Sequence, residues 1–131
     1  MAKATITIYQ KPTCTTCRQV HAALKESGVN FDTVDYYLAP IPRTKLKELL
    51  SKMGITAKDL LRKREQAYKD LKFDEKVYSD AEILDLISIY PDLIERPIVE
   101  WGERAILARP AEKIKEFLNP QPANPQPQVS T

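Results

Sequence analysis

The sequence of 131 residues contains only two cysteines and one histidine. These are too few for a closed four-ligand zinc site unless carboxylates or a second chain contribute, so we expect no bound metal and assign no other bound cofactor. The chain also lacks a run of about 18 apolar residues, and its N-terminus has no basic region followed by an apolar block. We therefore expect a cytoplasmic protein without a membrane segment.

The chain has almost no excess of charge. Twenty basic residues oppose 18 acidic ones, for a net charge of +2, which does not favour nucleic acid as a direct partner. Any anion site must therefore be local. Hydrophobic residues at 43% and charged residues at 29% are typical of a globular protein, and the length suits one domain, which we expect to be a monomer.

The end of the chain differs from the rest in composition. Residues 119–131 contain four prolines and no charged side chain, so they can bury little, and we expect a disordered tail. The proline spacing could suit a polyproline-reading domain, although an inert extension is the simpler interpretation. The folded domain is then expected to span residues 1–118.

The first forty residues predict a strand, a helix and a second strand. Residues 4–9 alternate in character and end before a Gln-Lys-Pro sequence, as a strand does before a turn. Helical spacing then follows as far as a Ser-Gly pair at 27–28, and residues 31–37 are typical of a second strand. The short crossover between the two strands favours parallel pairing.

The middle of the chain, about residues 41–92, predicts several short helices. Leucines at 46, 49 and 50 and Met53 repeat at helical spacing, and residues 56–59 and 79–82 resemble capping sequences that precede apolar residues. After it, residues 98–100 and 104–108 predict a hairpin, and Pro110 stands where a last helix can begin.

Two cysteines lie at the predicted start of the first helix, in the sequence Cys14-Thr-Thr-Cys17. Backbone N–H groups and the helix dipole at such a position favour a thiolate, and Lys11 and Arg18 add positive charge. We interpret Cys14 as the nucleophile and Cys17 as its resolving or switch partner. Both could instead be buried small residues or half of a shared metal site, and His21 could be a base or an ordinary helix-face residue.

Three arginines each stand at the end of a predicted element. Arg62 follows two leucines, and Arg96 and Arg109 each precede a proline, which restricts the backbone of the arginine toward extended geometry. If the three guanidinium groups converge near a thiolate, they can bind a tetrahedral oxyanion and lower the pKa of the thiol. A solvated surface position for any of them is the alternative.

Five segments of the chain carry a family resemblance. They are ITIY at residues 6–9, PTC at 12–14, LLRK at 60–63, LIERPIV at 93–99 and ARP at 108–110. In order and spacing they resemble the glutaredoxin-linked arsenate reductases of the ArsC family. The resemblance implies an α/β, thioredoxin/glutaredoxin-like fold with a four-stranded mixed sheet and a helical insertion, with Pro97 as a cis-proline beside the active cysteine.

The same resemblance implies an activity, the reduction of arsenate to arsenite. Cys14 would attack arsenate, three arginines (Arg62, Arg96 and Arg109) would hold the oxyanion, and glutathione with glutaredoxin would regenerate the thiol. Two departures stand out, because Gln10-Lys11 replaces a His-Asn pair and well-known reductases lack a cysteine at the position of Cys17. A Cys14–Cys17 disulfide could therefore replace part of the glutathione pathway, with thioredoxin as an alternative electron donor.

The second cysteine also resembles the Spx-type regulators, which share the fold, use a Cys-x-x-Cys switch and bind RNA polymerase. Arg62 and Arg96 have counterparts in that branch, whereas Arg109 does not. Arg109 and the LLRK sequence favour a reductase. A redox-sensing regulator and a thiol reductase for another substrate stay as the alternatives.

Overall fold

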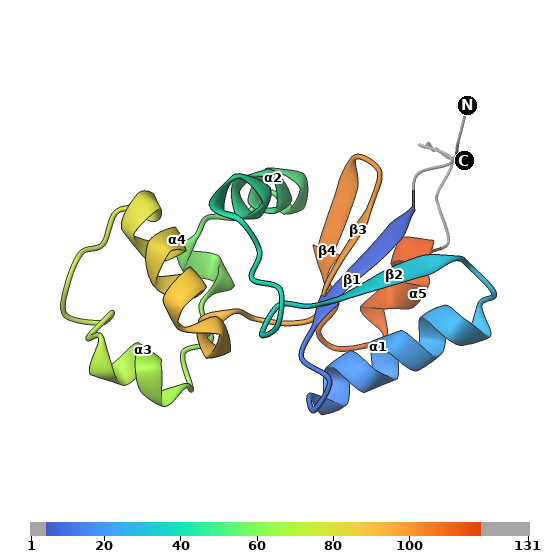
Figure 1. Ribbon diagram of the computed structural model, residues 1–131, viewed down its shortest axis with the longest axis horizontal. Coiled ribbons are helices and arrows are strands. Elements are labelled where there is room, and N and C mark those ends of the chain that lie inside the picture. The colour runs from blue at the N-terminus through green and yellow to red at the C-terminus, as the bar shows by residue number, and fades with distance from the viewer. Residues whose placement is uncertain (1–4, 119–131) are drawn as a thin grey trace.

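The computed structural model describes residues 5–118, so the predicted tail at 119–131 lies outside the described residues (Figure 1). No helix within this described range is long and apolar enough to span a bilayer. The elements follow the chain as β1 (Ile6–Gln10), α1 (Thr15–Glu26), β2 (Phe31–Asp35), α2 (Arg43–Met53), the 3-10 helix η1 (Lys58–Leu60), α3 (Gln66–Asp70), α4 (Asp80–Ile89), the 3-10 helix η2 (Pro91–Leu93), β3 (Ile98–Trp101), β4 (Arg104–Leu107) and α5 (Lys113–Leu118).

The four strands form one mixed sheet in the order β2-β1-β3-β4. Strand β1 pairs with β2 in parallel, with Ile6 opposite Phe31, and it pairs with β3 in antiparallel fashion, with Tyr9 opposite Ile98. Strand β4 returns beside β3 through a two-residue turn that contains Gly102 at a φ of 63°. The α/β class with a four-stranded mixed sheet, expected from the sequence, is confirmed.

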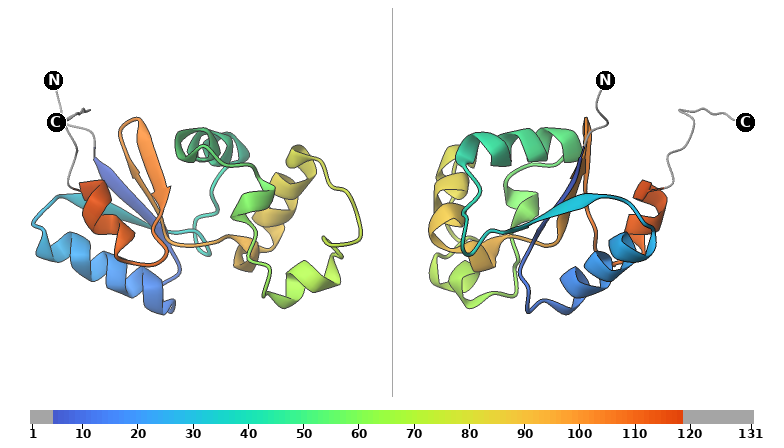
Figure 2. Two further views of the ribbon diagram at one scale, coloured as in Figure 1. Left: turned by 180° about the vertical axis from the view of Figure 1, so that it is seen from behind. Right: turned by 45° about the vertical axis from the view of Figure 1, so that its right-hand side comes forward.

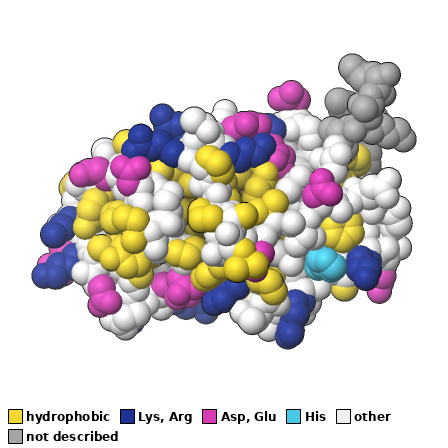
Figure 3. Space-filling model, viewed as in Figure 1, with side chains coloured by type: hydrophobic (Ala, Val, Ile, Leu, Met, Phe, Trp, Pro, Cys, Tyr) yellow, Lys and Arg dark blue, Asp and Glu magenta, His cyan; other side chains and the backbone are white. Residues whose placement is uncertain are grey.

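Side chains that alternate along the strands divide the core into two clusters, one on each face of the sheet. Ile6, Ile8 and Val99 pack with α1 and α5, whereas Tyr9 and Ile98 pack with the helical insertion. Figure 2 shows α1 and α5 together on one side of the sheet and α2 on the other. On the face drawn in Figure 3, hydrophobic side chains gather mostly over the insertion.

Helix α1 begins and ends where its local sequence requires. Cys14 is the N-cap residue in extended conformation, and Gly28 follows the helix at a φ of 75°, in the left-handed region where a residue without Cβ is not strained. Cys17, Val20 and Leu24 form its buried face at three- and four-residue spacing. The helix therefore places one cysteine at its tip and the other in the core.

The two predicted capping sequences of the insertion have different outcomes. Ser79 and Glu82 form the complete capping box of α4. Thr56 and Asp59 also exchange reciprocal hydrogen bonds, of 2.9 and 3.3 Å, but only the 3-10 turn of η1 follows. The chain then becomes extended because Leu61 pairs with Ile94 in an isolated antiparallel bridge, so tertiary pairing overrides the local helical signal.

The last helix begins later than the proline suggests. Helix α5 starts at Lys113, because Lys113 and Ile114 each donate a backbone hydrogen bond to the residue three positions earlier. This tighter spacing forms a turn rather than α-helix over residues 110–112. Pro110 itself follows a cis peptide bond.

A buried carboxylate ties α2 to the sheet. Glu100 of β3 is 7% exposed and accepts hydrogen bonds from Tyr9 and from the ammonium groups of Lys45 and Lys52. Burial opposes ionisation of this carboxyl, but the two lysines and the tyrosine outweigh it and lower the pKa of Glu100 to about 2. The network links the centre of the sheet to one face of α2.

We expect the Glu100→Gln variant to lose about 3 kcal/mol of unfolding free energy at pH 7, because two lysines lose their buried partner. The pKa of Glu100 is lowered on folding, so its contribution is complete above the ordinary value of about 4.3 and disappears as the pH falls toward 2. Urea denaturation at pH 7 and at pH 3 should show the gap to wild type narrowing at the lower pH.

Glu48→Gln provides the matched control, since the half-exposed carboxylate of Glu48 contacts the same two lysines. Solvent screens that carboxylate, so we expect a much smaller loss of stability. Equal losses in the two variants, or a gap that does not change with pH, would contradict a stabilising role for the buried network.

Candidate active site

The site begins at the joint between β1 and α1. The Cys14 side chain is half-buried at the tip of α1, where its Sγ accepts a hydrogen bond of 3.3 Å from the backbone N–H of Cys17. A turn in which Cys14 N–H donates to the Lys11 carbonyl at 3.0 Å holds the residue in place. The sulfur therefore faces a backbone donor at the positive end of a helix.

Cys14 is the more acidic of the two thiols. Burial opposes its ionisation, but hydrogen bonding from Cys17 and the positive charge of Arg96 outweigh burial and hold the pKa of Cys14 below its ordinary value. The sequence predicted that Lys11 would also lower the pKa of Cys14. Its ammonium instead lies 3.4 Å from Asp92 and over the ring of Tyr37. Arg96 is the cation that acts on the sulfur instead.

Cys17 has the opposite character. Its side chain is fully buried, and burial together with the neighbouring Cys14 raises the pKa of the Cys17 thiol to about 12. Both cysteines are free thiols. Cys17 therefore stays protonated at neutral pH and supports Cys14 as a hydrogen-bond donor. His21, one turn further along α1, packs edge-on against Phe31.

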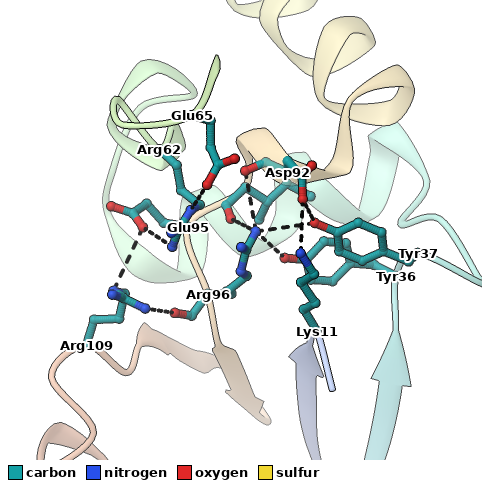
Figure 4. Close-up of polar contacts among 10 residues, drawn as sticks. Lys11, Tyr36, Tyr37, Arg62, Glu65, Asp92, Glu95, Arg96 and Arg109 are labelled. Atoms are coloured by element: carbon teal, nitrogen blue, oxygen red, sulfur yellow. Dashed lines mark hydrogen bonds and ion pairs between the residues drawn. The ribbon is translucent and has the colours of Figure 1, made fainter. Parts of the chain in front are cut away.

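Arg96 lies inside the protein, at 5% exposure, immediately before the cis peptide bond to Pro97. Its Nη1 donates to the carbonyls of Asp92 and Ile94, each at 3.3 Å, and lies 3.5 Å from the hydroxyls of Tyr36 and Tyr37 (Figure 4). These partners keep the buried guanidinium in one orientation. The sequence did not single out the two tyrosines.

Two buried polar atoms in this region have no partner. Among residues 5–118, the buried side-chain atoms without a hydrogen bond are Gln10 Oε1 and Arg96 Nε. Both residues are more than nine-tenths buried, and burial of an unpaired acceptor or donor costs about 1 to 3 kcal/mol. Arg96, whose charge acts on the Cys14 sulfur, thus keeps one unpaired donor.

Arg62 and Arg109 meet at one carboxylate, that of Glu95. Glu95 Oε1 lies 3.3 Å from Arg62 Nη1 and 3.9 Å from Arg109 Nε. Arg62 Nε also binds Glu65 at 3.1 Å, and Arg109 Nη1 donates to the Arg96 carbonyl at 3.0 Å. Figure 4 shows the side chains of this group arranged around residues 95 and 96.

The structure thus places the predicted residues in two connected groups. Cys14, Cys17 and Arg96 form one, and Arg62 and Arg109 form the other, joined to the first through the Arg96 backbone. The sequence did not single out Glu95, although it stands inside the LIERPIV segment, because an acidic residue beside an arginine is ordinary on a protein surface. No group of three potential metal ligands occurs within residues 5–118.

Comparisons with known proteins agree on one family. The model of the ArsC family matches residues 9–117. An arsenate reductase from Yersinia enterocolitica is 40% identical over 118 residues, which cover 89% of this chain and 82% of that protein. An arsenate reductase from Escherichia coli strain K12 is 35% identical over a match that covers 86% of this chain and 80% of that protein.

A solved structure agrees as well. The arsenate reductase from Vibrio cholerae superposes with a TM-score of 0.82 at 28% identity, over 88% of this chain and 98% of that one. The shared architecture is the thioredoxin-like fold, as the sequence segments predict. The agreement extends over the sheet and the helical insertion.

The difference in acidity between the two cysteines predicts selective alkylation. We expect iodoacetamide to modify Cys14 with a pH midpoint below the ordinary cysteine value of about 8.5 and to leave Cys17 unmodified in the native protein. Rates followed by peptide mass spectrometry between pH 5 and 10 measure this. The unfolded protein is the control, in which both thiols should titrate normally, and a native Cys14 midpoint at or above that of the unfolded chain would refute the prediction.

Proposed function

The chain belongs to the ArsC family, and from this premise we propose that it is an enzyme that reduces arsenate to arsenite with thiols as the source of electrons. The observation that carries the proposal is the Cys14 thiol with a lowered pKa, held at a helix N-terminus beside the buried Arg96. A thiolate is the form of cysteine that attacks an electrophilic centre. The relatives named arsenate reductase support arsenic as that centre.

The first step is substitution at arsenic(V). The Cys14 thiolate forms an S–As bond, and one As–O bond breaks as its oxygen leaves with protons as water. Arg62, Arg96 and Arg109 offset the negative charge on the remaining oxygens. Within this group Arg96 Nε, which has no partner among the described residues, can donate to an arsenate oxygen.

The second step is the reduction. A second thiol attacks Cys14 Sγ, an S–S bond forms, and the electron pair of the S–As bond passes to arsenic, which leaves as arsenite in the +3 state. The attacking thiol loses its proton to the departing arsenic oxygens. We assign this role to Cys17 or to glutathione; the disulfide that results is then reduced by thioredoxin or, through glutaredoxin, by glutathione.

Cys17 is well placed for the internal route. Its backbone nitrogen lies 3.3 Å from Cys14 Sγ, and the two residues are one helical turn apart. Burial and the neighbouring Cys14 raise the pKa of Cys17, so Cys17 is a protonated thiol while Cys14 is ionised. Both thiol donors belong to a reducing compartment, which is why we place the monomeric enzyme in the cytoplasm.

The mechanism predicts that Cys14→Ser abolishes arsenate reduction, by about a thousandfold or more, because a serine hydroxyl is not ionised at neutral pH. Coupled oxidation of NADPH with arsenate, glutathione, glutaredoxin and glutathione reductase measures it. Retention of wild-type turnover by this variant would refute the proposed chemistry.

The Cys17→Ser variant separates the two routes. If Cys17 resolves the intermediate, thioredoxin-coupled reduction should be lost while glutathione and glutaredoxin still support turnover. Retention of both activities would instead show that a thiol of the electron donor, and not Cys17, attacks Cys14 Sγ. Absence of arsenate turnover in the wild-type protein with both donors would instead favour a redox sensor, to be tested by capture of RNA polymerase subunits with reduced and oxidised protein.

A further inference from the structure

The arginine pair of the site is already occupied by a carboxylate of the chain itself. Glu95 Oε1 lies between Arg62 Nη1, at 3.3 Å, and Arg109 Nε, at 3.9 Å. Carboxylate and arsenate oxygens are acceptors for the same guanidinium donors. An oxyanion that binds these donors must therefore compete with the Glu95 side chain for them.

The local charge makes this competition costly for a dianion. Arg62, Arg96 and Arg109 bring three positive charges, and Glu65 and Glu95 remove two of them. With the Cys14 thiolate counted as well, a divalent oxyanion that enters while Glu95 keeps its position meets a site with no positive charge in excess. When the Glu95 carboxylate leaves Arg62 and Arg109, both guanidinium groups become available to the ligand.

The Glu95 side chain also has space into which it can move. Its side chain is 29% exposed, and it lines a pocket of about 320 Å³ together with Lys58, Lys63 and Arg64. Asp59 and Leu61 complete this lining. A carboxylate that leaves Arg62 and Arg109 can therefore turn toward other cations without crossing the protein.

The backbone keeps its place during such a movement. Glu95 N–H donates to the Leu60 carbonyl at 2.8 Å, and Arg62 N–H donates to the Leu93 carbonyl at 2.7 Å. These bonds flank the bridge between Leu61 and Ile94, so the two segments are fixed and only the side chain of Glu95 has to rotate. The exchange is a rotamer change rather than a rearrangement of the fold.

We propose that Glu95 is a specificity-determining residue, an internal carboxylate that occupies Arg62 and Arg109 and sets the affinity of the site for oxyanions. The identity of the oxyanion rests on the proposed function, but the competition does not. The occupied pair weakens the binding of abundant inorganic anions, and only a ligand that also bonds to Cys14 gains enough to displace the carboxylate.

The test is the Glu95→Gln variant, which removes the charge and keeps an amide oxygen that can accept from Arg62. We expect calorimetry at pH 7.5 and low salt to show that this variant binds inorganic sulfate about tenfold more tightly than wild type. In arsenate turnover, KM should fall by about the same factor while kcat changes less than about twofold. The reason is that loss of the Glu95 charge strengthens the binding of substrate and transition state equally.

Glu103→Gln is the matched control, because Glu103 is exposed in the β3–β4 turn and its replacement changes the net charge equally. We expect wild-type sulfate affinity from it. Thermal unfolding of all three proteins should confirm that each is folded. Sulfate affinity in Glu95→Gln that equals or falls below wild type would overturn the inference, as would an equal gain in Glu103→Gln or no sulfate binding by any protein.

The two proposals fail in different ways. Tighter sulfate binding by Glu95→Gln without arsenate turnover in any variant would support the role of Glu95 and overturn the reductase activity. Normal turnover with unchanged sulfate affinity and unchanged KM in Glu95→Gln would support the activity and reduce Glu95 to a residue that only orders the arginines.

Discussion

The antiparallel register between β1 and β3 determines the site. Tyr9 lies opposite Ile98, so the residues that follow β1 and those that precede β3 leave the same edge of the sheet. Cys14 comes from the first segment and Arg96 from the second, and the buried guanidinium consequently acts on the sulfur. A shift of the register by one residue would also turn Ile98 and Val99 to the wrong faces, so the packing of the core and the placement of Arg96 depend on the same pairing.

A second pairing adds the helical insertion to this site. The bridge between Leu61 and Ile94 holds Arg62 beside Glu95 although 33 residues separate them. Both leucines before Arg62 are buried, so the insertion cannot release the arginine without exposing apolar surface. Packing of the insertion thus fixes the position of Arg62. Glu95 and Arg96 both belong to the segment of residues 93–96, which pairs with the insertion through Ile94.

The site contains charges of both signs, and the burial and hydrogen-bond partners of each ionisable side chain determine its role. Burial makes Cys17 a persistent thiol, whereas a helix end and a cation favour the thiolate of Cys14, so two identical side chains acquire different chemistry. Likewise, Arg96 is committed to carbonyls and tyrosine hydroxyls of its own chain, while Arg62 and Arg109 share a carboxylate that can move. The site combines a rigid half with an exchangeable half.

Local patterns were enough to predict the strands, the helix that carries the cysteines, the Ser79 capping box and the residues with reactive or charged groups. The segments around Cys14, Arg62, Arg96 and Arg109 also predicted the family. Where η1 ends and where α5 begins depended on long-range pairing and on a tight turn, which no local pattern encodes. The sequence by itself determined which chemical groups are present, because periodicity and caps act over a few residues. Only the tertiary structure decided that Arg96, not Lys11, faces the sulfur and that Glu95 joins two arginines, because those contacts arise from strands that meet across the fold.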